Sequence, residues 1–245
     1  MKRGGIDIGS RFVKYVVLND GGTTSFYKSE TGHNPLSVCK RLISSDRPDK
    51  LTATGYGRHL MEVLDDTQTI TEIKAVARGA KEVFPRCRTV IDIGGQDTKV
   101  VSLRADGRVL AFEMNDRCAA GTGRFMEIMA KALGYAISDF GQDCVADNDG
   151  NITINSMCTV FAESEVVSLI NKGVGREQIS RSLHLSIAQK VIALAKRVEV
   201  NEDIVFAGGC AKNRRLISIL EDSFQKAIFV SESPDMLAAL GAALY

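Results

Sequence analysis

Residues 6–18, IDIGSRFVKYVVL, return without gaps as residues 91–103, IDIGGQDTKVVSL. Each copy has an apolar strand carrying one Asp, a tight turn containing Gly, and a second strand with a Lys and β-branched residues. Turn-forming residues close both copies, NDG at 19–21 and ADG at 105–107. The repeat therefore predicts two β-hairpins and two related halves of one chain.

Strand-like and helix-like apolar patterns alternate along the rest of the chain, which predicts an α/β protein. Phe125, Ile128 and Met129, for example, have helical spacing, and Gly134 stands where such a helix would end. No low-complexity linker is visible, so the two halves are expected to share a tight interface. We expect helices at residues 35–44, 71–84, 123–133, 159–171, 177–197, from 213 onward and from 234 to 245, and further strands at 51–54, 109–114, 204–207 and 227–230.

The chain's charge and hydropathy exclude several classes of partner. Its 245 residues carry 31 basic and 30 acidic side chains, so no net field favours nucleic acid or an anionic membrane. An apolar signal segment is absent, and no window approaches 18 uncharged apolar residues. We therefore expect a cytoplasmic protein with no nucleic-acid and no membrane partner, which binds small ligands or proteins.

Each hairpin carries the residues of a phosphate site. The carboxylates of Asp7 and Asp92 can hold Mg²⁺ through water, while the turns at 9–11 and 94–97 can direct backbone amides at phosphate oxygens. A third piece is the strand at 204–207, which runs into a diglycine where backbone can lie flat against a purine or ribose. The candidate nucleotide-binding residues are Gly9, Ser10, Arg11, Lys14, Gly94, Gly95, Gln96, Asp97, Gly121, Thr122, Gly208, Gly209 and Lys212, and the candidate catalytic residues are Asp7, Asp92 and Glu72.

These three pieces, in this order, resemble the phosphate-1, phosphate-2 and adenosine motifs of the superfamily that holds actin, sugar kinases and heat-shock chaperone ATPases. The resemblance covers nearly the whole chain, and no P-loop GxxxxGK[ST] is present. It implies two ribonuclease H-like domains, each a mixed five-stranded sheet with helices, and ATP in the cleft between them. The expected boundaries are residues 1–75 with 235–245 for domain I, and 76–234 for domain II.

Two of the six cysteines precede predicted helices. Cys118 comes shortly before the helix expected near residue 123, and Cys158 directly before the one expected at 159. A helix N-terminus, with its unpaired amides and partial positive charge, lowers a thiol pKa. A [4Fe–4S] cluster needs four thiolates, which two such cysteines per chain supply in a twofold dimer. Cys144 is an alternative partner for a site within one chain, and oxidation of Cys210, directly after the diglycine, is expected to disturb nucleotide binding.

The segments at 92–99, 115–125 and 157–165 closely resemble the ATP-dependent activators of 2-hydroxyacyl-CoA dehydratases, which have relatives in benzoyl-CoA reductases. The resemblance implies that Cys118 and Cys158 of two subunits bind one [4Fe–4S] cluster at a homodimer interface. ATP, bound with Mg²⁺, would change the angle between the helices that point at the cluster. An electron received from a donor such as ferredoxin or flavodoxin would then pass to a partner iron–sulfur dehydratase or reductase.

The sequence leaves alternatives open for the residue that orients the attacking water and for the reaction itself. Many activators have a Thr-Glu-Ile sequence followed by a His. This chain has Thr-Glu-Ile at 71–73 but Lys74 in place of the His, so the role of that His is not assured here. Glu72 either orients the attacking water or faces solvent. The turn at 121–123 is a candidate sensor of the γ-phosphate, and the three histidines lack metal-ligand spacing and are expected to be structural or exposed. Two alternatives remain: a small-molecule kinase with Asp116 at the acceptor hydroxyl, and a nucleotide-dependent iron–sulfur scaffold that transfers no electron.

Overall fold

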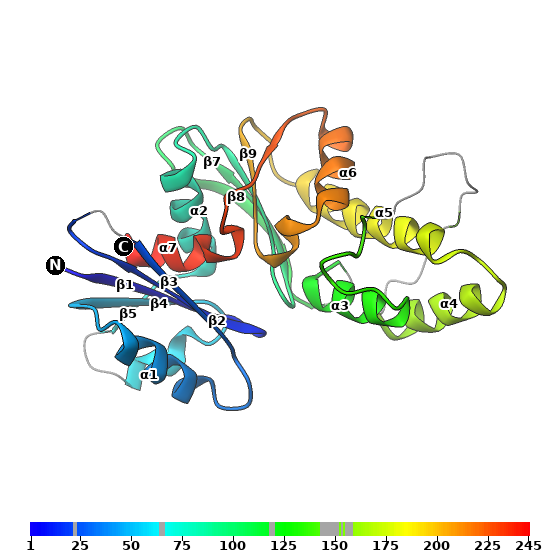
Figure 1. Cartoon of the computed structure of the whole chain (residues 1–245). Coiled ribbons are helices and arrows are strands. Elements are labelled where there is room, and N and C mark those ends of the chain that lie inside the picture. Colours follow the sequence, from blue (N-terminus) through cyan, green and yellow to red (C-terminus); the bar gives the residue numbers. More distant parts are fainter. Residues whose placement is uncertain (22–23, 64–66, 118–120, 143–151, 153, 155–158) are drawn as a thin grey trace.

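The computed structural model describes the chain except residues 22–23, 64–66, 118–120, 143–151, 153 and 155–158 (Figure 1). The described strands form two separate mixed sheets of five strands each, which confirms the expected fold class. A region built of helices extends from the second sheet on the side away from the first (Figure 1).

The first sheet has the strand order β3-β2-β1-β4-β5. The hairpin strands β1 and β2 and the next strand β3 are antiparallel, whereas β4 runs parallel to both β1 and β5. Two of the five, β3 and β5, were not expected from the sequence, because β3 alternates mostly polar residues on a half-exposed sheet edge and β5 has only three residues. The bounds are β1 Arg3–Ile8, β2 Phe12–Leu18, β3 Thr24–Glu30, β4 Lys50–Thr54 and β5 Thr67–Thr69.

The second sheet repeats the topology of the first. Its order β10-β9-β6-β7-β8, read from the other edge, places the hairpin β6–β7 and the strand β8 where the first sheet has β1, β2 and β3. The strands β9 and β10 are parallel to β6 and to each other, as β4 and β5 are to β1. The sequence repeat is thus a repeat of structure. The bounds are β6 Thr89–Ile93, β7 Thr98–Leu103, β8 Val109–Asn115, β9 Ile204–Ala207 and β10 Ile228–Phe229.

Seven α-helices lie within the described residues, and six agree closely with the expected ranges. The correction concerns the last one: residues Pro234–Met236 form a 3₁₀ turn, η3, and the α-helix begins only at Leu237. The turn keeps Asp235 buried and bound to lysines of two other segments. The helices are α1 Pro35–Ser45, α2 Glu72–Val83, α3 Gly123–Ala132, α4 Thr159–Asn171, α5 Arg176–Ala195, α6 Arg214–Phe224 and α7 Leu237–Ala243, with further 3₁₀ turns η1 Arg58–Val63 and η2 Gly209–Lys212.

Two helices, α2 and α7, pack on each other between the sheets (Figure 1). Their backbones touch, since a Cβ at Gly79 would overlap the Leu237 carbonyl and a Cβ at Gly241 would overlap the Ala75 carbonyl. The C-terminal helix also contacts β1, β2 and β4, so the end of the chain returns to the first sheet. The predicted domain boundary between residues 75 and 76, inside α2, stays a prediction.

The largest apolar core lies between the second sheet and the helices α3, α5 and α6. Phe125, Phe140 and Phe206 are among its fully buried side chains. Among the described residues, no helix is both long and apolar enough to cross a membrane.

Candidate functional site

A cleft of about 1310 Å³ opens between the two sheets. Its walls contain both hairpin turns, the N-terminus of α2 and the diglycine segment after β9. The structure therefore brings together residues that the sequence singled out in four separate segments. The predicted site residues that line the cleft are Asp7, Gly9, Ser10, Arg11, Lys14, Glu72, Asp92, Gly94, Gly95, Gln96, Asp97, Gly208, Gly209 and Lys212.

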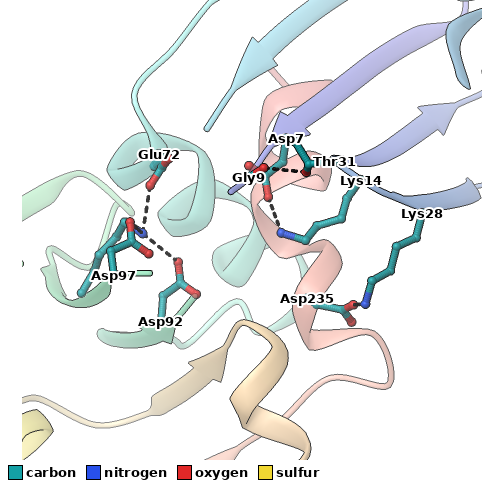
Figure 2. Close-up of polar contacts among 10 residues, drawn as sticks. Asp7, Gly9, Lys14, Lys28, Thr31, Glu72, Asp92, Asp97 and Asp235 are labelled. Atoms are coloured by element: carbon teal, nitrogen blue, oxygen red, sulfur yellow. Dashed lines mark hydrogen bonds and ion pairs between the residues drawn. The ribbon is translucent and has the colours of Figure 1, made fainter. Parts of the chain in front are cut away.

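Each hairpin presents one Asp–Lys pair to this cleft. Lys14 is the cross-strand partner of Asp7, and its Nζ lies 2.8 Å from the carboxylate (Figure 2). Lys99 is likewise the cross-strand partner of Asp92, with Nζ 3.6 Å from Oδ2. Lys99 was not among the predicted site residues, although the sequence repeat aligns it with Lys14.

Lys99 is a buried lysine at the centre of an acidic cluster. Its Nζ lies 2.6 Å from Asp97 Oδ2 and 2.9 Å from Glu72 Oε2, in addition to its contact with Asp92. Burial opposes its charge, but the three carboxylates outweigh burial and raise the pKa of Lys99. For Asp92 and Glu72, burial is the larger effect and raises their pKa values despite the lysine. The cluster around Lys99 therefore has more acidic groups than basic ones.

Glu72 is the first residue of α2, and Thr71 caps the helix by accepting a hydrogen bond from Lys74 N. The Glu72 carboxylate is directed at Lys99 and lines the cleft, so the alternative that Glu72 simply faces solvent is wrong. Its role toward an attacking water stays a prediction.

The two turns meet across the cleft. In the first, the Thr31 hydroxyl donates to the Gly9 carbonyl at 2.7 Å and Thr31 N donates to the Arg11 carbonyl (Figure 2). In the second, Gly94 N donates to the Asp97 carbonyl at 2.9 Å. A Cβ at Gly95 would lie only 3.1 Å from Ser10 Oγ, so the glycine permits this close approach.

The diglycine segment is fixed against the second hairpin and the C-terminal segment. Gly208 has φ +85°, and a Cβ there would overlap the Ile93 carbonyl, which explains the need for glycine. Gly208 N donates to the Pro234 carbonyl at 3.0 Å.

Asp235 joins the two sheets at this point. Its carboxylate binds Lys28 of β3 at 2.6 Å (Figure 2) and Lys212 at 3.2 Å. Burial would raise the pKa of Asp235, but its hydrogen bonds and ion pairs with the two lysines lower it on balance. Lys28 and Asp235 were not predicted, and no local sequence signal connects positions so far apart.

Of the turn at 121–123, Gly123 lines the cleft, whereas Gly121 and Thr122 are not in the cleft wall. Both Gly121 and Thr122 are buried, and the Thr98 hydroxyl donates to the Gly121 carbonyl at 2.9 Å. The amides of Gly123 and Arg124 donate to the carbonyls of Gly94 and Gly95, each at 2.9 Å. Direct contact of Gly121 or Thr122 with a ligand is therefore not supported. The expectation that the amides at the start of α3 are unpaired is also corrected, because two of these amides donate hydrogen bonds to the hairpin carbonyls.

An ion-pair chain links the first turn to α3 as well. Glu127 accepts from Arg11 Nε at 3.2 Å and from Arg124 at 3.2 Å. The helix α3 is thus held by both hairpin turns.

Three of the cysteines, Cys118, Cys144 and Cys158, lie outside the described residues. Cys39, Cys87 and Cys210 are free and buried. Burial is the main reason that the pKa of Cys210 rises to about 12, with Asp92 and Glu127 adding to it. A buried thiol that stays protonated resists oxidation. The expectation that oxidation of Cys210 would disturb nucleotide binding stays a prediction.

The histidines behave as expected: His33 and His59 are exposed and His184 is buried. No group of three or more His, Cys, Asp or Glu is placed to hold a metal ion within the described part of the chain. Asp7 and Asp92 do line one cleft, and Mg²⁺ commonly uses one or two carboxylates together with substrate phosphates and water. The donor set therefore fits a Mg²⁺ that arrives with a phosphate ligand. Asp116, the candidate of the kinase alternative, also lines the cleft.

Comparison with known proteins gives a consistent result. The model of the BadF/BadG/BcrA/BcrD ATPase family matches residues 5–245. The chain is 39% identical to the 2-hydroxyisocaproyl-CoA dehydratase activator of Clostridioides difficile, over 98% of this chain and 93% of the relative. It is 40% identical to the (R)-2-hydroxyglutaryl-CoA dehydratase activating ATPase of Acidaminococcus fermentans, over 98% and 95%. The solved activator of the 2-hydroxyisocaproyl-CoA dehydratase from Clostridium difficile with bound ADPNP has a TM-score of 0.86 at 40% identity, covering 100% of this chain and 94% of that one.

Proposed function

The chain belongs to the BadF/BadG/BcrA/BcrD ATPase family and has an actin-like ATPase fold, and from this premise we propose that it is an ATP-hydrolysing activator of a partner iron–sulfur enzyme. It transfers a low-potential electron from a [4Fe–4S] cluster shared by two subunits. The observation that carries the ATP site is the pair of equivalent Asp–Lys hairpins facing one cleft, Asp7–Lys14 and Asp92–Lys99.

In this proposal the triphosphate lies between the two turns. The backbone at Gly9–Arg11 and at Gly94–Asp97 holds phosphate oxygens, and the diglycine at Gly208 and Gly209 carries the adenosine. Asp7 and Asp92 would hold Mg²⁺, which would supply charge neutralisation. Glu72 orients the attacking water, since it belongs to the acidic cluster at the end of the cleft where α2 begins.

The second hairpin transmits the nucleotide state to α3. The carbonyls of Gly94 and Gly95 accept hydrogen bonds from the first two amides of this helix. When the presence or loss of the γ-phosphate shifts this turn, the start of α3 therefore moves with it. Cys118 precedes this helix by five positions. The predicted sensor at 121–123 would therefore act through the hairpin, by way of Thr98 and Gly121.

Cys118 and Cys158 are the proposed cluster ligands. The helix α4 begins at Thr159, directly after Cys158, and α3 and α4 pack against each other (Figure 1). One chain offers two such thiols, whereas the cluster needs four, so a twofold homodimer is required. The cluster supplies one-electron redox chemistry at low potential. An apolar face of α4 that is left in solvent supports an interface there; it is formed by Val160, Phe161, Val167 and Ile170.

The proposed electron acceptor is a 2-hydroxyacyl-CoA dehydratase or a related reductase. This follows from the relatives, which include two dehydratase activators and a component of the benzoyl-CoA reductase of Thauera aromatica. The proposed donor is a small reduced carrier such as ferredoxin or flavodoxin. A cluster near solvent would be sensitive to air, which suits an anaerobic cytoplasm.

Anaerobic purification tests the proposal. We expect a brown dimer with about one four-iron cluster per two chains, since each chain contributes two ligands. The paramagnetic signal of the reduced cluster should change on addition of ATP. A colourless monomer that phosphorylates a sugar would instead support the kinase, and a cluster that is never reduced and passed on would support the scaffold.

Cysteine variants test the ligand assignment. Cys118→Ser and Cys158→Ser should each abolish the cluster and leave ATP binding intact, whereas the matched control Cys144→Ser should keep the cluster. Iron retained in both single variants, or lost only in the Cys144 variant, would refute the assignment.

A further inference from the structure

His184 is a fully buried histidine for which the proposed chemistry has no use. It lies in α5, and its Nδ1 is 2.7 Å from the Ser180 carbonyl, to which only an N–H can donate. The proton of the neutral imidazole is therefore on Nδ1, and Nε2 is free to accept. Burial, with Arg215 nearby, lowers the pKa of His184 to about 4, which keeps the ring neutral near pH 7.

Asn213 is the residue that uses this acceptor. Its Nδ2 lies 3.0 Å from His184 Nε2 and also donates to the Phe140 carbonyl at 2.7 Å. Its Oδ1 accepts from Leu216 N at 2.9 Å and so caps α6. The cap fixes which end of the amide is oxygen, and therefore both amide hydrogens are directed at His184 and Phe140.

The turn that contains Phe140 rests on the imidazole. The two rings have centroids 4.5 Å apart, and a Cβ at Gly141 would lie 2.7 Å from His184 Nε2. Phe140, Gly141, Gln142 and Asn213 all line the cleft, together with Lys212 and the diglycine. The imidazole is thus the support behind one wall of the cleft, next to the segment proposed to carry the adenosine.

We propose that His184 is a positioning residue for the nucleotide base: through Asn213 it holds the turn at 140–142 in the place where this turn forms the wall of the base site. The inference rests on the proposed function, because it takes the diglycine side of the cleft as the adenosine side. It assigns His184 no contact with the reacting phosphates. Its loss should therefore weaken ATP binding without slowing the chemical step.

Steady-state ATP hydrolysis by the anaerobic dimer separates these effects. His184→Leu removes the acceptor and leaves an Asn213 hydrogen without its partner, so KM for ATP should rise about tenfold with kcat within about twofold. His184→Gln supplies an oxygen acceptor at a similar reach and should restore KM. The exposed His33→Leu is the control and should match the wild type.

Asn213→Ser provides a second route if the leucine variant does not fold. Serine still caps α6 but lacks the amide donor, so KM should rise as in His184→Leu. Combined with His184→Gln, this variant should keep the raised KM of Asn213→Ser, because the glutamine oxygen then has no Asn213 amide from which to accept. An unchanged KM in both single variants, or a fall in kcat with unchanged KM, would overturn the inference. A wild-type protein that hydrolyses no ATP would overturn the proposed function itself.

Discussion

Lys14 and Lys99 hold equivalent positions in the two hairpins, and each stands directly across from an aspartate. Their surroundings differ, however. Lys14 has one carboxylate within ion-pair distance among the described residues, that of Asp7, whereas Lys99 has three. The repeat thus supplies a common frame, and the lysine of the second copy contacts two further carboxylates, those of Asp97 in its own turn and of Glu72 at the start of α2.

Replacing Lys99 should therefore cost more stability than replacing Lys14. Lys99→Met leaves the buried Asp92 and the half-buried Glu72 and Asp97 without their cation, and we expect the free energy of unfolding to fall by about 3–5 kcal/mol. Lys14→Met breaks one pair and should cost less. Urea unfolding followed by circular dichroism at pH 7.5 measures both. If both variants lose the same free energy of unfolding, the additional carboxylates around Lys99 do not make its replacement more costly.

Glu72→Gln tests the proposed water-orienting residue. The amide keeps the shape of the side chain and its hydrogen bond to Lys99, so ATP binding should persist. Loss of the carboxylate should lower kcat for ATP hydrolysis by about 10²–10⁴-fold. The exposed Glu82, on the same helix, provides the control Glu82→Gln, which should not alter kcat. If both variants hydrolyse ATP at the wild-type rate, another residue orients the water.

His184 should make the protein sensitive to mild acid. Its folded-state pKa of about 4 lies below the ordinary value of 6.5, so between these values the unfolded chain binds more protons than the folded one. The stabilisation is complete above pH 6.5 and declines as the pH falls toward 4. We expect a loss of about 2 kcal/mol between pH 7.5 and pH 5, measured by urea unfolding. His184→Gln should remove this part of the pH dependence, and an identical pH profile in that variant would contradict it.

Thr98→Val tests the link between the second hairpin and the turn before α3. The variant keeps the shape of the side chain but removes the hydrogen bond to the Gly121 carbonyl. We expect unchanged ATP affinity and a smaller nucleotide-induced change in the paramagnetic signal of the reduced cluster. Ser102→Ala on the same strand is the matched control, since the Ser102 hydroxyl is buried and has no partner among the described residues. A full nucleotide response in Thr98→Val would exclude this route.

The sequence by itself was enough to predict the two hairpins, the order of the three proposed nucleotide motifs and the positions of most helices. These features are local, because a repeat, a strand period and a helix period are all written in neighbouring residues. The repeat even implied two related sheets, and the strand orders confirm this. The assignment of Cys118 and Cys158 also comes from the sequence alone.

Local sequence patterns did not predict the edge strands β3 and β5, and they placed the start of the last helix too early. The strand β3 has a polar composition and is recognised only by its pairing with β2, and β5 only by its pairing with β4. Residues 234–236 look like the first turn of a helix, but the buried Asp235 and its two lysines accompany a 3₁₀ turn instead.

Only the tertiary structure decided which side chains meet. Lys28 and Asp235 are 207 positions apart and Asn213 and His184 are 29 apart, yet each pair shares a hydrogen bond beside the cleft. The same holds for Glu72, whose carboxylate meets Lys99 only because α2 begins beside the second hairpin. Such contacts depend on how the sheets and helices pack as a whole, and no period or spacing along the chain encodes them.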